Sequence, residues 1–208
     1  MLSKQGFDLW ANEYEQTVQI SEDNNLYPFA GYKEILNLIF NEAMQVEKSR
    51  VLDIGFGTGT LASKLYDNYH TVDGIDFSPE MIAIAQPKMP EANLVEWDIS
   101  TGMPAALAHN KYDTIISTYA LHHLEDKEKV AFIQELLPLL TADGKIQIGD
   151  IAFQTRAQLE KCKADSIAYW DGDEFYFVFD EIEEALKDLC RCEFHAVSHC
   201  GGVITLSR

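Results

Sequence analysis

VLDIGFGTGT, residues 51–60, runs from a short apolar segment into a turn that contains three glycines. A continuous apolar run bounded by turn residues is typical of a strand buried on both faces. The next segment, TLASKLYDNY (60–69), spaces its large apolar residues as a helix does. Gly55 and Gly57 allow a tight turn and let a ligand approach the backbone without a Cβ in the way. The stretch therefore predicts a strand, a ligand-binding loop and a helix, in that order.

The same alternation continues on the carboxyl side of the loop. Helical segments lie between short β-branched segments, which implies a parallel sheet covered by helices on both faces. Gly201-Gly202, between the strand-like CEFHAVSH and VITLSR, predicts a terminal antiparallel hairpin. We therefore expect an α/β fold with a Rossmann-like, doubly wound, mostly parallel seven-stranded sheet that ends in this hairpin. The other strands are predicted at 50–54, 70–76, 93–97, 112–118 and 145–152, with helices at 60–69, from Ser78 and at 126–140, and a turn at 142–144.

The chain of 208 residues is expected to form one domain, because no linker, repeat or low-complexity segment divides it. Helical patterns precede and follow the alternating core. The expected parts of this single domain (1–208) are an N-terminal helical cap (1–45, with helices at 6–17 and 28–44), a cofactor-binding core (50–152), and a substrate-side insert with the terminal hairpin (153–208, with helices near 155–168 and 180–190).

Acidic residues dominate the charge of the chain: 34 Asp and Glu against 16 Lys and Arg give a formal net charge of −18. Such a surface repels the phosphates of nucleic acids and anionic lipid headgroups, so neither a nucleic acid nor a membrane is an expected partner. No apolar run reaches the roughly 18 residues of a membrane-spanning helix, and the N-terminus lacks the apolar segment of a signal peptide. We expect a cytoplasmic protein.

The cysteines all lie in the last quarter of the chain and lack the C-x₂-C spacing of metal sites. In a cytoplasmic chain we expect reduced thiols, and we expect no metal ion. The residues concerned are Cys162, Cys190, Cys192 and Cys200.

Two aspartates follow predicted strands at the edge where the glycine loop lies. Asp76 ends the second strand, about 20 residues after Gly55, where a carboxylate can accept both hydroxyls of a ribose. Asp98 follows the third strand, directly after Trp97. The carboxyl ends of parallel strands meet at one edge, so these residues predict a nucleoside site. A dinucleotide-binding domain shares these elements, but Thr60 stands where its third glycine would fall.

In the content and order of its motifs the chain resembles the class I S-adenosylmethionine-dependent methyltransferases. Together with FDLWANEYEQTV near the N-terminus, the motifs are most similar to those of the YrrT-like group of small bacterial methyltransferases. The matching segments are VLDIGFGTGT (51–60), GIDFSPEMI (74–82), VEWDI (95–99), YDTIISTYALHHL (112–124) and LLTADGKIQIGD (139–150).

The resemblance implies that S-adenosyl-L-methionine is the cofactor. Gly55 and Gly57 would pass under its methionine and ribose portions, with Asp53 near the amino group. Phe56 departs from the small residues expected in such a loop, and it would either crowd the methionine tail or point away from it.

The same resemblance assigns the nucleoside part of the cofactor. Asp76 would bind the ribose hydroxyls, Asp98 would accept from the adenine amino group, and the Ile99 amide would donate to a ring nitrogen. Trp97 or Phe77 would pack on the adenine face. The complete predicted cofactor set is Asp53, Gly55, Gly57, Asp76, Phe77, Trp97, Asp98, Ile99 and Thr118.

The sulfonium is expected near the end of the fourth strand, which makes Tyr119, His122 and His123 the candidate catalytic residues. Histidine is the natural base near neutral pH, but two adjacent histidines cannot both face one crevice. An aromatic and acidic roof is expected over the acceptor. Its members would be Trp10, Tyr14, Tyr169, Trp170 and Tyr176.

The predicted function is methyl transfer from S-adenosyl-L-methionine to a small soluble molecule, which the motifs do not identify. The acidic roof favours a cationic or amine-bearing acceptor. Two alternatives remain open: a non-catalytic S-adenosylmethionine-binding module, and an NAD-dependent oxidoreductase.

Overall fold

The structure is a computed structural model that describes residues 26–208. The helix predicted at 6–17, with Trp10 and Tyr14, lies outside the described residues. Within the described part, no helix is both long enough and apolar enough to cross a lipid bilayer.

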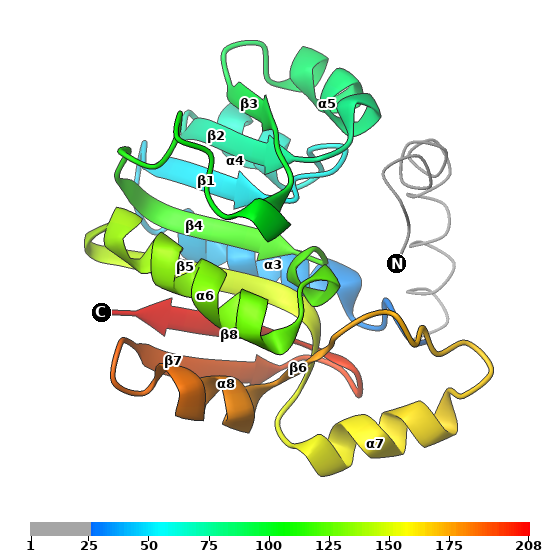
Figure 1. The fold of residues 1–208 in the computed structure, drawn as a ribbon. Helices are drawn as coiled ribbons and strands as arrows, with labels where there is room; N and C mark the ends of the chain where they lie inside the picture. Colours follow the sequence, from blue (N-terminus) through cyan, green and yellow to red (C-terminus); the bar gives the residue numbers. More distant parts are fainter. Residues whose placement is uncertain (1–25) are drawn as a thin grey trace.

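One sheet runs through the centre of the described chain (Figure 1). Its strands are β1 (Arg50–Ile54), β2 (Thr71–Asp76), β3 (Asn93–Glu96), β4 (Tyr112–Thr118), β5 (Leu140–Phe153), β6 (Phe177–Val178), β7 (Arg191–Ala196) and β8 (Gly201–Ser207). Their order is β3-β2-β1-β4-β5-β8-β7, and β6 pairs with the end of β5. The strands from β3 to β5 are parallel, whereas β8 is antiparallel to β5 and β7. The predicted doubly wound sheet with an antiparallel end is confirmed, and β6 is an additional strand.

Helices cover both faces of this sheet, as Figure 1 shows. They are α3 (Tyr32–Ala43), α4 (Ala62–Asp67), α5 (Pro79–Ala85), α6 (Asp126–Leu136), α7 (Arg156–Asp165) and α8 (Phe179–Leu186), with 3-10 turns η1 (Gln86–Lys88), η2 (Ile99–Thr101), η3 (Leu121–His123) and η4 (Leu137–Leu139). Successive side chains of a strand point to opposite faces. Val51 and Ile116 accordingly pack with α3 and α4, while Leu52 and Ile115 pack with α6 and α8. The apolar strands of the sequence are therefore buried on both sides.

The predicted turn at 142–144 is wrong. These residues lie inside β5, which begins at Leu140 and carries an irregularity opposite Tyr112 and Thr114. The sequence Ala-Asp-Gly resembles a turn because the strand is locally bulged, and a bulge uses the same small and polar residues.

The predicted position of the hairpin turn is also wrong. Gly201 and Gly202 belong to β8, and residues 197–200 connect it to β7. A Cβ on Gly202 would lie only 2.6 Å from the ring of Phe194 on the neighbouring strand. The glycine therefore permits close packing between strands instead of forming the turn.

Helix α3 approaches the sheet closely because Gly149 of β5 has no side chain. A Cβ at this position would lie 2.4 Å from Cγ2 of Ile35 and 2.8 Å from Cδ1 of Ile39, which are both fully buried. The close approach fixes the start of α3, whose Tyr32 and Leu36 border the cavity described below.

We expect Gly149→Ala to lower the melting temperature by about 2–12 °C. Overpacking a core costs about 1–3 kcal/mol, and at this chain length 1 kcal/mol corresponds to about 2–4 °C. Thermal unfolding followed by circular dichroism measures the change. Gly172→Ala is the control, because nothing lies within 4 Å of its Cβ position. An unchanged melting temperature in Gly149→Ala would contradict the close approach of α3.

Candidate functional site

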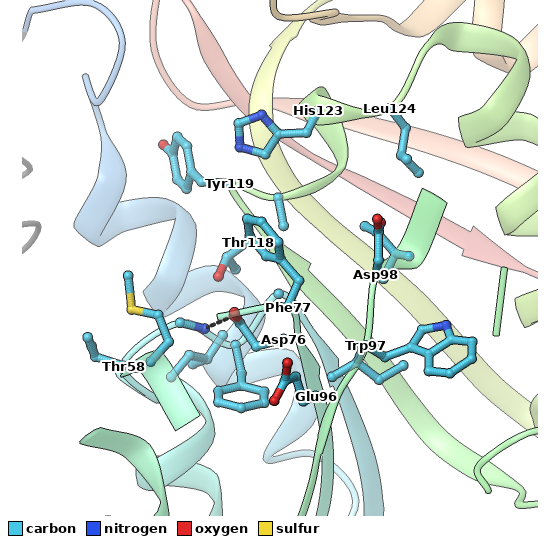
Figure 2. Close-up of a pocket in the computed structure, with 18 of the residues that line it drawn as sticks. Thr58, Asp76, Phe77, Glu96, Trp97, Asp98, Thr118, Tyr119, His123 and Leu124 are labelled. Atoms are coloured by element: carbon cyan, nitrogen blue, oxygen red, sulfur yellow. Dashed lines mark hydrogen bonds between the residues drawn. The ribbon is translucent and has the colours of Figure 1, made fainter. Parts of the chain in front are cut away.

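A cavity of about 700 Å³ opens at the carboxyl ends of β1 to β4 (Figure 2). It lies where the chain, after building β1 to β3, crosses to β4 on the other side of β1. Ligands of doubly wound sheets bind at this switch point. The described residues that line it are Tyr32, Leu36, Gly55, Phe56, Gly57, Thr58, Thr60, Leu61, Ile75, Asp76, Phe77, Met81, Glu96, Trp97, Asp98, Ile99, Ser100, Thr101, Thr118, Tyr119, Ala120, His123 and Leu124. Every predicted cofactor residue except Asp53 is among them.

The glycine loop presents open backbone to this cavity. Gly55 and Gly57 adopt left-handed conformations with φ of 69° and 55°, which favour glycine. A Cβ on Gly55 would lie 2.3 Å from the Cβ of Ala120, so this loop and the loop after β4 touch at the sheet edge. Nothing lies within 4 Å of the Cβ position of Gly57, which borders the cavity. A ligand can therefore lie directly against the backbone there.

Asp76 holds this loop in place through its carboxylate. Its Oδ2 accepts a hydrogen bond from the Gly57 amide at 2.8 Å, and its Oδ1 accepts one from the Ser78 amide at 2.9 Å. A carboxylate oxygen can in general accept more than one hydrogen bond. The arrangement suits a ligand with two neighbouring hydroxyl groups.

Asp98 and Trp97 lie on the side of the cavity away from Thr58, and Phe77 lies between them and Thr58, as Figure 2 shows. The Asp98 carboxylate accepts from the Ser100 amide at 2.9 Å. The Trp97 indole donates to the Gly102 carbonyl at 2.8 Å, and its ring turns away from Asp76. The Phe77 ring projects toward Thr118. Of the two aromatic candidates for a ligand's flat face, Phe77 is the better placed.

Phe56 does not block the loop. Its ring is buried against Gly74 of β2, where a Cβ would come within 2.7 Å of it. It packs in a small apolar cluster beside α5, which also contains Ala62, Val72, Ala85, Met89 and Ala92. The ring of Phe56 thus packs between β2 and α5, although the residue borders the cavity.

The sequence analysis missed several lining residues, among them Glu96, Tyr32 and Leu36. Glu96 precedes Trp97 at the end of β3, and only this position signals it. Tyr32 and Leu36 come from α3, which precedes the core in sequence. No local pattern places them at the cavity, since their position depends on how α3 docks on Gly149.

Asp53 lies beneath the glycine loop without bordering the cavity. It is almost fully buried, and its Oδ1 has no hydrogen-bond partner among the described residues. Burial, together with the nearby charge of Asp76, raises the pKa of Asp53 from 3.8 to about 8.

The loop after β4 carries the three predicted catalytic residues, and the structure separates them. Tyr119 adopts a left-handed conformation with φ of 51°, which is costly for a residue other than glycine and is seen at functional sites. Tyr119 and His123 lie side by side at one end of the cavity (Figure 2). His122 does not line the cavity. Its Nδ1 lies 2.6 Å from Oδ1 of the buried Asp150.

The two histidines have opposite protonation tendencies. Burial favours neutral His122, but Asp150 and Glu174 outweigh this and raise the pKa of His122. Burial, aided by the charge of His122, lowers the pKa of His123 to about 3. At neutral pH the histidine that faces the cavity is therefore uncharged.

The predicted aromatic roof is wrong for its described members. Tyr169 is 82% exposed, and neither Trp170 nor Tyr176 borders the cavity. Trp170 stacks on Tyr27 with ring centroids 5.1 Å apart, and the Tyr176 hydroxyl hydrogen-bonds to that of Tyr27. These aromatic rings therefore pack against one another and hold the segment before β6.

Comparisons with known proteins agree with this geometry. Residues 51–144 match the family model described as a methyltransferase domain. An uncharacterized methyltransferase of Bacillus cytotoxicus is 40% identical over 157 residues, covering 74% of this chain and 70% of that protein. One from Staphylococcus carnosus is 34% identical over 191 residues, covering 88% and 86%. Among solved structures, the DhpI–SAM–HEP complex superposes with a TM-score of 0.69 at 19% identity, covering 97% of this chain and 94% of that one.

The cavity at the switch point, the glycine loop and the carboxylate at the end of β2 are features shared with nucleoside-binding α/β enzymes. The chain belongs to the methyltransferase family. The resemblance to the class I S-adenosylmethionine-dependent methyltransferases is thereby confirmed, while membership of the YrrT-like group stays a prediction.

We expect Asp53→Asn to raise the melting temperature of the ligand-free protein at pH 8, with the gain vanishing near pH 4. The unfolded carboxyl ionises near 3.8 and the folded one near 8, so the unfolded state binds fewer protons between these values. Stability therefore falls as pH rises through this window, and asparagine removes the loss. Melting curves from pH 4 to 9 measure it. Parallel curves for the two proteins would show that Asp53 is not desolvated.

Proposed function

We propose that the protein transfers a methyl group from S-adenosyl-L-methionine to a small soluble acceptor. The observation that carries the proposal is the Asp76 carboxylate, held beside an open glycine loop at the switch point. The acidic surface, with a net charge of −18, supports a small molecule over a nucleic acid as acceptor. We also propose that the enzyme is cytoplasmic and YrrT-like.

The residues of the cavity fit this cofactor better than one with phosphates. S-Adenosylmethionine carries a sulfonium and an amino acid where a dinucleotide carries a pyrophosphate. Lysine and arginine are absent from the described lining, which includes the carboxylates of Asp76, Glu96 and Asp98. This charge favours a cationic ligand and disfavours NAD. The SAM named in the DhpI complex supports the same choice.

S-Adenosylmethionine, when bound, supplies a methyl group activated by the positive sulfur. The protein's part is to hold and orient it. Asp76 would accept from the ribose hydroxyls, Asp98 and the Ile99 amide would pair with the adenine edge, and Phe77 would pack on its face. Positioning alone can contribute roughly 7–11 kcal/mol to a reaction of two groups, so these contacts need not include a base.

The acceptor is expected at the end of the cavity formed by Tyr119 and His123. A base works best when its pKa lies near the working pH, and the pKa of His123 near 3 makes it a poor one. We infer that neutral His123 orients the acceptor. His122 does not line the cavity, and its ring is hydrogen-bonded to Asp150.

Calorimetry and a transfer assay test this function. The purified protein should bind S-adenosylhomocysteine and not NAD, and methyl-labelled cofactor should pass label to a low-molecular-weight product in a metabolite extract. Tight NAD binding without S-adenosylhomocysteine binding would overturn the proposal. Cofactor binding without transfer in any extract would favour the non-catalytic module.

Asp76→Ala and Asp98→Ala should each weaken S-adenosylhomocysteine binding roughly 10- to 150-fold. Hydrogen bonds to charged groups contribute about 1.5–3 kcal/mol, and 1.4 kcal/mol corresponds to a factor of ten. Asp76→Ala should have the larger effect, because it also releases the Gly57 amide. Calorimetric dissociation constants give the comparison. Asp67→Ala, at an exposed position of α4, is the matched control. Affinities within twofold of wild type for both site variants would refute the assignment.

A further inference from the structure

Three side chains from two distant segments meet beside the end of the cavity that holds Tyr119, and one of them, His123, lines it. His122 and His123 come from η3, and Glu174 comes from the segment before β6. One potential ligand atom from each lies within 4.8 Å of the others. We propose that His122, His123 and Glu174 bind a divalent transition-metal ion, for which Zn²⁺ is the best match.

The spacing of these atoms is close to that of a metal site. Nε2 of His122 lies 3.6 Å from Oε1 of Glu174. Ligand atoms about 2.0–2.2 Å from a tetrahedral zinc ion lie roughly 3.3–3.6 Å from one another. Small rotations of the Glu174 carboxylate and the His123 ring would bring all three atoms to this separation.

His122 is already oriented as a metal ligand. Its Nδ1 lies 2.6 Å from Oδ1 of Asp150, an oxygen that also accepts from the Ile151 amide at 2.8 Å. When Nδ1 alone carries a proton, the lone pair of Nε2 is directed toward Glu174, and a bound ion would take the place of the second proton on Nε2. Metal-binding histidines almost always donate their other ring nitrogen to such a carboxylate, which fixes the ring and its tautomer.

Glu174 has an orienting partner of its own. The Tyr176 hydroxyl donates to Oε2 at 2.6 Å, and Oε1 is the oxygen nearer His122. The backbone is fixed as well, because the Phe175 amide donates to the His122 carbonyl at 2.8 Å and the buried Lys129 ammonium donates to the Phe175 carbonyl. The ligand from the distant segment is therefore held against η3.

The set of donors indicates the class of ion. Two imidazoles and one carboxylate suit zinc or ferrous iron, whereas magnesium and calcium take mainly oxygen ligands. The side chains of His122 and Glu174 are 6% and 18% exposed, so the charges are only weakly screened by solvent. Zinc sites with three protein ligands leave a fourth position for water or substrate.

The location of the ion gives it a role in the reaction, and this step rests on the proposed function. His123 lines the cavity, so an ion bound to it lies at the acceptor end. An acceptor with a hydroxyl or thiol group would bind the ion as its anion, and the proton would pass to solvent. The lone pair of that oxygen or sulfur would then form the bond to the methyl carbon. The carbon–sulfur bond of the sulfonium would break with its electron pair staying on sulfur. The acceptor class is thus an oxygen or sulfur nucleophile that binds metal.

Metal titration of the full chain tests the site directly. Protein freed of metal with a chelator is titrated with Zn²⁺ by calorimetry and with Co²⁺ by visible absorption. We expect one ion per chain and Co²⁺ bands typical of low coordination number. Asp150→Asn should weaken binding about 10- to 100-fold, as outer-shell variants do, and Glu174→Gln and His123→Ala should weaken it further. Glu183→Gln and His195→Ala, at exposed positions of α8 and β7, are matched controls and should bind as wild type does.

The outcomes separate this proposal from the proposed function. S-Adenosylhomocysteine binding is measured on the same samples. If it binds but Zn²⁺ and Co²⁺ do not, or if Glu174→Gln binds metal as wild type does, the metal site is refuted and the methyltransferase assignment stands. If metal binds as expected and S-adenosylhomocysteine does not, the proposed function fails alone. Glu174→Gln keeps the size of the side chain and an acceptor for Tyr176, so it decides the question even where His123→Ala does not fold.

Discussion

The architecture of the site depends on Asp76, because its backbone and its carboxylate join three strand ends. The side chain accepts from Gly57 in the loop after β1 and from Ser78 at the start of α5. The main-chain carbonyl accepts from the amide of Trp97, just beyond β3, at 2.8 Å. A buried carboxylate is costly unless its oxygens are satisfied, and here backbone amides donate to both oxygens. The same residue thereby orders the loop and lines the cavity.

Asp53 and Asp76 lie at the ends of adjacent strands. Their identical side chains differ in burial and in hydrogen bonding. Asp76 faces the cavity and accepts backbone hydrogen bonds, whereas Asp53 is enclosed and its pKa is raised. Because the pKa of Asp53 is raised to about 8, this group is largely protonated at neutral pH, and the negative charge at the glycine loop comes from Asp76. A ligand that brings positive charge to this edge of the sheet relieves the cost of burying two acids there.

The sequence could place the predicted cofactor residues, except Asp53, around one cavity because they follow strands directly. The order of Gly55, Asp76 and Asp98 is local information, and parallel strands bring their carboxyl ends together. The acceptor half could not be predicted in this way. Which histidine faces the cavity is decided by Asp150, which lies 28 residues beyond His122. Glu174 reaches η3 through β6, a strand of two residues that is too short to show a pattern.

The fold was predictable to the same extent. Continuous apolar runs and segments with helical spacing predicted the alternation of strands and helices. A sheet buried on both faces needs such apolar strands. The wrong turn predictions involved segments that contain glycine, because a glycine in a sequence has two structural explanations. A turn and a close packing contact both select glycine, and only the neighbour across the strand, Phe194 for Gly202, distinguishes them. The aromatic segment around Trp170 was misplaced for a similar reason, because its stacking partner Tyr27 lies far away in sequence.

The pairing of β6 with β5 has a consequence for how such enzymes can diverge. The chain leaves the sheet after Phe153 and returns at Phe177, which pairs with Ala152, so the two ends of the intervening segment are adjacent. Doubling the length of a loop whose ends are fixed costs only about 0.6 kcal/mol. Residues 154–176, drawn with α7 at the edge of the molecule in Figure 1, can therefore be lengthened, shortened or exchanged without disturbing the register of the sheet. Related enzymes can therefore differ in the sequence and length of this segment while the strands that border the cavity stay the same.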